Sequence, residues 1–522
     1  MATHDDDCYE KMKKRSNSSS SNSSSTKSVP LGGSLLSDTM KGLFKGGGYL
    51  LGRHFNRKKE GASFGEEKDF SSYLNPRNDG LLLDGNKLHL SERDSMQNVC
   101  VMARIGAGKT SRYIIPNILQ KARTKCSMVV NDPKGEVFEN TSEHMRRSGY
   151  KVVVIDPENL ERSSRFNPFT EARNEIEIEQ IAEILIHSGS PRQGGKDEFW
   201  LNGATRFVSL FIKCLKNAGR DNPAYYNLHN LYYLFQNFGE DGQQLEEFML
   251  RYVRNPDDAL DNTLWNEWQG VLTGNKEGVQ SFILNAITAL RSLSNRNIAA
   301  LTARSDIDLE DIRSEKTIIY MITPAQNTEY YGFLTSLFFR SVFNACMRKM
   351  PDRRTLPVYI LYDEFGHSTI PNFVSTANTI RGYNVSISII LQSISQLSAR
   401  YGQEYAYSIQ GGFNTYLTYA GADPETAKFF EQITGRTRER QKEHFLDIVE
   451  TYQEYNLMNA GDVRTIHESE ALIVSGNRHP IKLKTTPYFE NWSLKRCANK
   501  GPAKLPSPEH HSAYLQYVGL ER

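Results

Sequence analysis

The pattern of apolar and polar positions changes character along the chain. From about residue 80, short apolar runs such as "NVCVMA", "CSMVVND" and "YKVVVIDP" alternate with segments of helical spacing such as "KTSRYIIPNILQKAR". Strands that are buried on both faces read as continuous apolar runs, and helices between them form parallel crossovers. This order predicts an α/β fold with a mainly parallel sheet.

The strand-like runs stop between about residues 171 and 310. "EIEIEQIAEILIH", "FWLNGATRFVSLFIKCLKN" and "GVQSFILNAITALRSLSN" place apolar residues at helical spacing there. The runs resume with "KTIIYMITP", "PVYILYDE", "VSISIILQ", "TYLTYAG" and "EALIVSG". We therefore expect an all-α insertion domain at 171–310, between two halves of a sheet domain at 63–170 and 311–492. In the insertion, Trp265 and Trp268 are expected as core anchors rather than as base-stacking platforms.

The two ends of the chain have a different composition. Residues 1–62 are expected to be a disordered arm and a linker. The arm, up to about residue 30, contains "RSNSSSSNSSSTKS", which cannot bury enough apolar surface to offset its ordering entropy. The glycine-rich stretch that follows is a flexible linker or a weak contact for a membrane surface or a partner. Residues 493–522 predict a tail, in which "AYLQYVGL" is a docking segment or a packed end.

Composition narrows the class of protein. The chain has 522 residues, 39% hydrophobic and 24% charged, with a formal net charge of +2, so it is globular and has no overall basic excess. A pore or groove can still be locally positive. The six cysteines lack a C-x-x-C pair, which predicts neither a zinc site nor a disulfide framework. No apolar window approaches the roughly 18 residues of a membrane span, and no signal peptide is evident. A cytoplasmic protein is expected.

The stretch "VMARIGAGKT" (101–110) nearly fits the phosphate-binding pattern G-x-x-x-x-G-K-[ST], with Ala103 in place of the first glycine. In such loops backbone N–H groups surround the phosphates, the lysine reaches the β and γ phosphates, and the hydroxyl helps hold Mg²⁺. Ala103 is tolerable at a negative φ and costs about 1 kcal/mol if the position requires a positive one. A strand-to-helix turn with a chance G-x-G-K-T is the alternative. The predicted nucleotide-contacting residues are Arg104, Ile105, Gly106, Ala107, Gly108, Lys109, Thr110 and Ser111.

Two later strand ends carry polar groups suited to the same site. "VYILYDEF" ends in two acids, of which Asp363 suits the water shell of Mg²⁺ and Glu364 suits the attacking water. Gln392 follows the next strand run, where its amide can sense the γ-phosphate, orient water, or simply cap the strand end. Paired with the glycine loop, the acids favour a working nucleotide site over a coincidence.

The amino-acid sequences of several segments resemble those of a known protein family. "VVNDPKGEVFENTSEHMRRSGYKVVVIDPENLERSSRFNPF" (129–169), "YDEFGHSTIPNF" and "IRGYNVSISIILQSISQLSARYG" resemble the TraG/TraD family of type IV secretion coupling proteins, in which D-x-K-G-E and F-N-P recur. The resemblance runs from about residue 95 to 490. It implies a RecA-like P-loop ATPase domain that uses ATP and Mg²⁺, with an inserted all-α domain.

The resemblance also implies roles for individual residues. Lys109 becomes a catalytic and nucleotide contact, Thr110 and Asp363 hold Mg²⁺, and Glu364 and Gln392 act in catalysis. Arg381 is a candidate arginine finger supplied across a subunit interface, against the alternative of a solvated loop arginine. The segment 132–136 lines the nucleotide or the subunit edge, or is a structural loop.

The implied function is that of a coupling protein. Such a protein brings a relaxase-bound DNA strand, or effector proteins, to a type IV secretion channel and powers or gates transfer in bacterial conjugation. The implied partners are single- or double-stranded DNA, relaxosome proteins, membrane-bound channel components and further copies of the chain, in a hexameric ring when active. The alternatives are a recruitment platform with little hydrolysis and a chromosome-segregation translocase.

One departure concerns the membrane. Many members of this family begin with transmembrane helices, and here the corresponding region is the serine arm and the linker. Either a membrane-bound partner recruits a cytoplasmic protein to the inner face of the membrane, or the segment from Leu43 to His54 associates peripherally.

Overall fold

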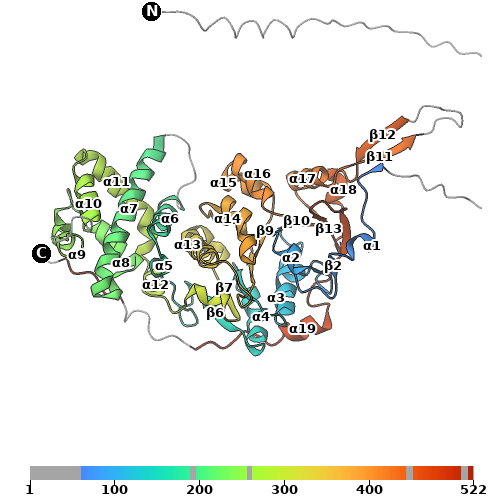
Figure 1. Ribbon diagram of the computed structural model, residues 1–522, viewed down its shortest axis with the longest axis horizontal. Coiled ribbons are helices and arrows are strands. Elements are labelled where there is room, and N and C mark those ends of the chain that lie inside the picture. Colours follow the sequence, from blue (N-terminus) through green and yellow to red (C-terminus); the bar gives the residue numbers. More distant parts are fainter. Residues whose placement is uncertain (1–59, 189–195, 256–261, 442–450, 507–514, 521–522) are drawn as a thin grey trace, which may run out of the picture. The chain divides into compact units, whose positions relative to one another are not determined.

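A large, mainly parallel sheet organises the computed structural model, which describes residues 60–188, 196–255, 262–441, 451–506 and 515–520. Among these residues, nine strands follow the order β14-β13-β10-β4-β9-β8-β5-β7-β6 (Figure 1). All neighbours from β10 to β6 run parallel, and β13 and β14 add an antiparallel edge. The predicted α/β class is confirmed. The strands are β4 Val99–Met102, β5 Ser127–Asn131, β6 Lys151–Ile155, β7 Thr317–Met321, β8 Val358–Tyr362, β9 Val385–Leu391, β10 Thr415–Tyr419, β13 Glu470–Ser475 and β14 Ile481–Lys484.

Helices cover both faces of this sheet, which is why its central strands are apolar throughout. Successive side chains of a strand point to opposite faces. In β4, Val99 and Val101 join one hydrophobic core, whereas Cys100 and Met102 join the other. Every residue of β4, β5, β7, β8 and β9 is buried. The helices of this part include α3 Ile115–Lys121, α4 Glu136–Arg147, α13 Thr328–Met347, α14 Phe373–Thr379, α15 Ser395–Tyr401, α16 Gln403–Gly411, α17 Pro424–Thr434, α18 Ala460–Arg464 and α19 Trp492–Ala498.

The regular elements described between β6 and β7 are all helices, which we call the helical segment. Asparagine side chains cap several of them: Asn174, Asn227, Asn275 and Asn295 each accept a hydrogen bond from an N–H of the first turn. Trp268 is 1% exposed, as expected for a core anchor, whereas Trp265 is only partly buried. The main helices are α5 Pro168–Glu171, α6 Glu175–His187, α7 Lys196–Asp221, α8 Leu228–Gln236, α9 Glu246–Tyr252, α10 Thr263–Leu272, α11 Lys276–Ala289 and α12 Arg296–Leu301.

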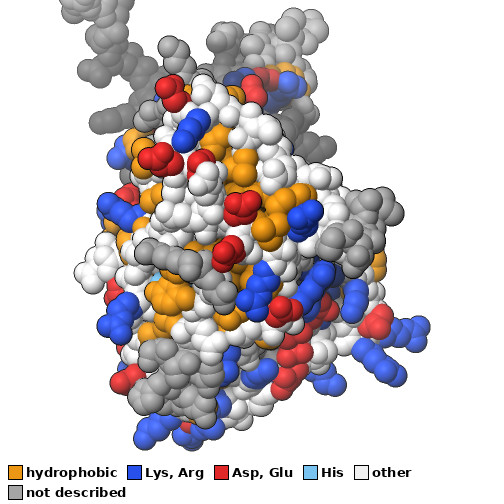
Figure 2. Space-filling model, turned by 90° about the vertical axis from the view of Figure 1, so that its left-hand side faces the viewer, with side chains coloured by type: hydrophobic (Ala, Val, Ile, Leu, Met, Phe, Trp, Pro, Cys, Tyr) orange, Lys and Arg blue, Asp and Glu red, His pale blue; other side chains and the backbone are white. Residues whose placement is uncertain are grey.

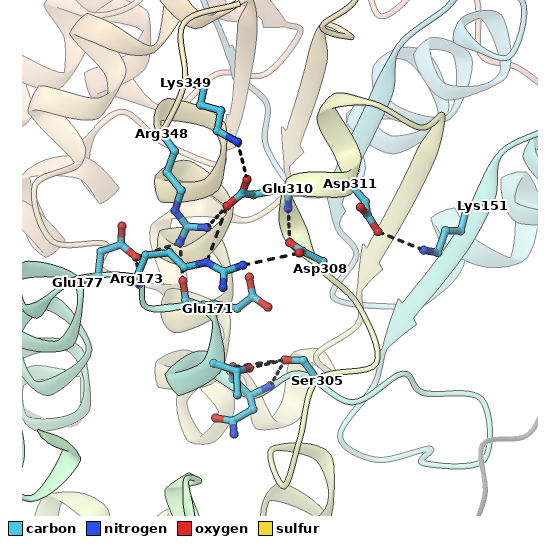
Figure 3. Close-up of polar contacts among 12 residues, drawn as sticks. Lys151, Glu171, Arg173, Glu177, Ser305, Asp308, Glu310, Asp311, Arg348 and Lys349 are labelled. Atoms are coloured by element: carbon cyan, nitrogen blue, oxygen red, sulfur yellow. Dashed lines mark hydrogen bonds and ion pairs between the residues drawn. The ribbon is translucent and has the colours of Figure 1, made fainter. Parts of the chain in front are cut away.

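A cluster of charged residues joins the start of the helical segment to the sheet (Figure 3). Arg348, which follows α13, pairs with Glu177 of α6 at 2.9 Å and with Glu310, which precedes β7, at 3.0 Å. Glu310 also lies 3.5 Å from Lys349 and 3.8 Å from Arg173. Because Arg348 is planar and has several donors, it can hold two carboxylates at once. The cluster therefore links three segments that are far apart in the sequence.

Smaller elements lie beside this framework. β1 Glu60–Gly61, β11 Arg436–Gln441 and β12 Thr451–Asn456 form a separate antiparallel sheet, and β2 Leu74–Asn75 pairs with β3 His89–Leu90. The short helices α1 Glu67–Phe70 and α2 Glu92–Ser95 accompany them. None of the helices in the described part of the chain is both long and apolar enough to cross a bilayer. The arm and linker predicted for residues 1–62, including Leu43 to His54, lie outside the described residues up to residue 59.

Glu171, at the end of α5, gives a testable pH dependence of stability. Its side chain is buried, and one of its carboxylate oxygens has no hydrogen-bond partner. Burial is the main cause that raises the pKa of Glu171 to about 7, and the nearby negative charge of Asp308 adds to the rise. The folded chain therefore keeps a proton that the unfolded chain loses above its ordinary pKa of 4.5. The free energy of unfolding should fall as the pH rises from about 4.5 to 7, by about 1–3 kcal/mol.

We expect Glu171→Gln to remove this dependence, because the amide keeps the shape and does not ionise. The variant should exceed the wild type in urea unfolding at pH 8 by about 1–3 kcal/mol and match it near pH 4.5. Glu175→Gln, at an exposed position on α6, is the matched control and should leave the pH dependence intact. Identical pH profiles for Glu171→Gln and the wild type would show that Glu171 is ionised in the folded chain.

Candidate nucleotide site

The carboxyl ends of four neighbouring strands meet at one edge of the sheet. In the registers, Met102 of β4 pairs with Leu391 of β9, and Tyr362 of β8 pairs with Ile389 of β9 and with Asn131 of β5. The residues that follow these strands therefore leave from the same edge. They are the glycine loop, the glutamine, the acidic pair and the segment 132–136. In open α/β sheets this edge is where ligands bind.

The glycine loop has the backbone that the phosphate-binding pattern requires. Gly106 and Gly108 have φ values of +82° and +85°, which residues with a Cβ rarely adopt. A Cβ on Gly106 would meet no atom within 4 Å, so this part of the loop faces open space. The loop thus leaves room beside its backbone for an anion.

Ala103 fits its position without strain. It is not among the described residues with a positive φ, its side chain is 2% exposed, and its N–H donates to the carbonyl of Leu391 at 2.9 Å. The first glycine of the pattern is therefore not required here for conformational reasons. Ala103 continues the hydrogen bonding of β4 to β9 by one residue, and its methyl group packs in the hydrophobic core.

The helix after the loop begins with a widened turn. Thr110–Ile114 is a π-helical turn, in which Ile115 N–H donates to Thr110 C=O. Pro116 explains this geometry, because a proline lacks the N–H and its ring clashes with the carbonyl four residues earlier. Such turns often occur at functional sites. The turn places Thr110 at the N-terminal end of the helix, where N–H groups and the helix dipole favour anions.

Lys109 lies between the two acids predicted for the site. Its Nζ is 3.1 Å from Asp363 Oδ1 and 3.7 Å from Glu364 Oε1, and all three side chains are at most 13% exposed. Burial raises the pKa of Asp363, and the charge of Lys109 opposes this rise. The Lys109 ammonium makes these ion pairs but has no hydrogen bond of good geometry. A buried donor of this kind fits a further anionic ligand such as a phosphate.

Glu364 is held in an unusual backbone conformation. Its φ of 54° and ψ of 43° are left-handed, which costs a non-glycine residue about 1 kcal/mol or more. Its Oε2 lies 3.6 Å from His367 Nε2, and its C=O accepts from the N–H of His367 at 3.0 Å. The preceding carbonyl, of Asp363, accepts from Asn131 Nδ2 at 2.7 Å. The two hydrogen bonds hold the main chain at this position, and His367 and Lys109 flank the Glu364 carboxylate. His367 was not predicted from the sequence, where its only signal is its place three residues after Glu364.

Gln392 lies at the same edge, directly after β9. Its N–H donates to Gln396 Oε1 at 2.8 Å. Gln396 packs so closely on Gly366 that a Cβ there would come within 2.8 Å of it. The turn after β9 is thereby fixed against the segment that follows the acidic pair. The role of the Gln392 amide itself stays a prediction.

The segment 132–136 also leaves this edge and has a structural task. Asp132 Oδ2 accepts from Phe138 N–H at 2.8 Å, so it satisfies a donor in the first turn of α4. Burial raises the pKa of Asp132 to about 7, and the charge of Asp363 contributes to this rise. Asp132 is thus both a helix cap and a neighbour of the acidic pair.

Arg381 is not brought together with these residues within one chain. It is exposed and lies in the turn Ile380–Tyr383, just before β9 begins. β9 ends at the site, so Arg381 lies at the opposite edge of the sheet. It therefore takes no part in the nucleotide site of its own chain, and its role as an arginine finger stays a prediction.

A glycine loop lies between a strand and a helix, and its buried lysine faces acids at the end of a strand two positions away in the sheet. This arrangement defines the class of P-loop nucleoside-triphosphate-binding proteins. The family described as "Type IV secretory system Conjugative DNA transfer" matches residues 61–510. The chain therefore belongs to this family of conjugative DNA transfer proteins.

Individual relatives are distant. The chain is 26% identical to Protein VirD4 of Rhizobium radiobacter over 434 residues, which cover 78% of this chain and 59% of that protein. It is 20% identical to a probable conjugal transfer protein TraG of Sinorhizobium fredii over 424 residues, covering 77% and 63%. The chain thus spans about 60% of the length of these curated relatives.

The fold is shared with a solved structure. The bacterial conjugative coupling protein TrwB superposes with a TM-score of 0.65 at 15% identity, over 82% of this chain and 94% of that chain. A structure of TrwB in complex with ADP and Mg²⁺ gives a TM-score of 0.63 at 14% identity, over 82% and 94%. The RecA-like P-loop fold expected from the sequence is therefore confirmed.

Ala103→Gly tests the explanation of the unusual loop residue. Because Ala103 needs no positive φ and its methyl group is buried, glycine should lower the free energy of unfolding by about 1–2 kcal/mol. ATP affinity, measured by titration with a fluorescent analogue, should stay within about twofold. Gly106→Ala is the comparison, because its strained φ should weaken nucleotide binding. Tighter ATP binding by Ala103→Gly would show that alanine does distort the loop.

Proposed function

We propose that this chain is an ATP-hydrolysing coupling protein that brings DNA, or effector proteins, to a type IV secretion channel and powers or gates their transfer in conjugation. The observation that carries the proposal is the convergence of Lys109 with Asp363 and Glu364 beside the glycine loop. The family match and the TrwB complex with ADP and Mg²⁺ support it.

The residues of the site divide the work of phosphoryl transfer. ATP with Mg²⁺ supplies the anhydride bond that is cleaved and a divalent charge that stabilises the leaving phosphates. The N–H groups of residues 104–111 and the ammonium of Lys109 would hold phosphate oxygens, and Thr110 and Asp363 would hold the cation. Glu364 takes a proton from the attacking water, and its fixed left-handed backbone keeps its carboxylate in place for that step. Gln392 orients the water from the neighbouring strand.

The helical segment is proposed to select protein partners such as relaxosome components. Its face in Figure 2 carries hydrophobic side chains in several separate groups among acidic and basic ones. Phe199, Trp200 and Leu284 are exposed by 64%, 37% and 65%. Exposed aromatic groups suit protein contacts better than phosphate-directed binding. DNA binding is assigned instead to the ring formed by several copies, where it should be sequence-tolerant and salt-sensitive.

The remaining parts of the proposal follow the family. The domain limits are 1–62, 63–170, 171–310, 311–492 and 493–522, and the active form is a hexameric ring. The protein acts in the cytoplasm, where a membrane-bound partner recruits it to the inner face of the membrane and to the channel. No observation favours the alternatives of a recruitment platform with little hydrolysis or a chromosome-segregation translocase.

ATP hydrolysis, measured with and without single-stranded DNA, tests the catalytic assignment. Lys109→Ala removes the phosphate contact, and Glu364→Gln removes the base while keeping its shape. Each should lower turnover about 100-fold or more. Lys125→Ala, at an exposed lysine before the amino end of β5, is the control and should turn over like the wild type. If wild type and both site variants share one background rate with DNA present, hydrolysis is not the function and the recruitment platform gains support.

Mixing two inactive variants tests whether Arg381 acts on a neighbouring copy. Arg381→Ala and Lys109→Ala should each be inactive alone. In an equal mixture about one interface in four pairs an intact Lys109 with an intact Arg381, so about a quarter of wild-type turnover should return. Mixing either variant with the double variant Lys109→Ala/Arg381→Ala provides the control for subunit exchange, because no interface then combines both groups. Full activity of Arg381→Ala alone, or no recovery in the mixture, would remove Arg381 from the mechanism.

A further inference from the structure

The last described residues, 515–520, contact α8 of the helical segment (Figure 1). The side-chain amide of Asn230 donates to Gln516 C=O at 2.9 Å and accepts from Val518 N–H at 3.0 Å. In an extended chain the C=O of one residue and the N–H two residues later point to the same side. One amide therefore binds the backbone of this segment as a neighbouring strand would. Asn230 is fully buried, so its position is fixed.

The side chains of the segment have contacts of three different kinds. Gln516 Oε1 accepts from Asn222 Nδ2 at 2.9 Å. Tyr517 bonds through its hydroxyl to His229 Nε2 at 2.8 Å, and its ring centroid lies 4.7 Å from that of Tyr233. Val518 is 1% exposed and joins the main hydrophobic core. Each of the three successive side chains, polar, aromatic and apolar, therefore contacts a different part of the helical segment.

The chain just before this segment is attached elsewhere, to α4. Ala503 N–H donates to Ser142 Oγ at 2.9 Å, and Lys500 Nζ lies 2.8 Å from His144 Nδ1. α4 starts at the edge of the sheet that holds the nucleotide site. Ala503 and Gln516 are 13 positions apart, so the chain between the two attachments spans at most about 45 Å. As long as both attachments hold, α8 cannot move further than this from α4.

We propose that α8 carries a binding site for an extended peptide of the pattern Gln-Tyr-Val, and that the chain's own residues 515–520 fill it. The filled site ties the helical segment to the nucleotide side of the molecule. The contacts are those of peptide recognition, since a buried amide pairs with main-chain groups, Val518 is buried, and Gln516 and Tyr517 each have a side-chain hydrogen bond. Without the segment, Asn230 Oδ1 loses this donor and Val518 leaves an apolar space, so the vacant site favours a replacement of the same chemistry.

Peptide binding to the full-length chain tests the proposal independently of ATP hydrolysis. In Val518→Asp the buried valine becomes charged, which should expel the chain's own segment and vacate the site. A fluorescent peptide with the sequence of residues 512–522 should then bind Val518→Asp at least about tenfold more tightly than the wild type, as measured by anisotropy. Val518→Asp/Asn230→Leu should lose this gain. Circular dichroism and thermal unfolding establish that each variant is folded.

Variant peptides make the test independent of changes in the protein. A peptide with Val518→Pro lacks the N–H that Asn230 accepts and should bind Val518→Asp at least about tenfold more weakly. A peptide with Tyr517→Phe loses only the bond to His229 and should weaken less. The proposal is overturned if folded Val518→Asp does not bind the wild-type peptide, because the segment is then only a packed end. The proposal is also overturned if the wild-type peptide binds the wild-type protein and Val518→Asp equally well. The same holds if the Val518→Pro peptide binds Val518→Asp as tightly as the wild-type peptide does, because the peptide then binds elsewhere.

Discussion

The buried ion pair between Lys109 and Asp363 joins the glycine loop to the strand that carries the acids. Taking either charge out of water alone is costly, and removing one partner of a buried pair typically costs about 3–5 kcal/mol. With Glu364 only 3.7 Å from the same ammonium, one positive charge faces two carboxylates. A free phosphate would meet this excess of negative charge. A polyphosphate with a divalent cation avoids this repulsion, because the cation can neutralise the acids while a phosphate group pairs with Lys109. The electrostatics of the site therefore favour a metal-bound nucleotide over a simple anion.

The arrangement of this site follows from the sheet, and much of the sheet could be predicted from the sequence. Parallel strands covered on both faces have to be apolar throughout, so β4 to β9 are visible as uninterrupted runs. The predicted helix "EIEIEQIAEILIH" coincides with α6, Glu175–His187. The acidic pair and Gln392 could be placed at strand ends for the same reason. The apolar runs do not reveal the order of the strands in the sheet. The sequence alone therefore could not place β9 between β4 and β8.

Other features could not be predicted, for physical reasons that differ from case to case. β11 and β12 read as "RTRERQ" and "TYQEYN", so they have no apolar run and their pairing depends on the backbone. The role of Ala103 depends on its φ, which a pattern of residue types does not specify. His367 lies beside the Glu364 carboxylate because the left-handed backbone at Glu364 starts a tight turn, and the sequence does not reveal this conformation. The pairing of Asn230 with Gln516 spans 286 positions, and neither residue type signals it locally.

Two attachments of different physical character hold the helical segment in addition to the apolar core. The cluster around Arg348 is ionic, and its outer members, such as Arg173 at 50% side-chain exposure, are open to screening by salt. The contact of residues 515–520 with α8 consists of neutral hydrogen bonds and a buried valine, which salt screens little. A displacement of α8 from α4 beyond the reach of the connecting chain must break one of the two attachments of that chain. The apolar core, by contrast, continues from α13 into α6 without a break, since Phe338 and Ile178 belong to the same cluster. α8 belongs to the same cluster through Leu231 and Phe235, so packing binds α6 and α8 alike to the sheet. Residues 515–520 add a second link from α8 to α4, and only this link can be replaced by a peptide of the proposed kind.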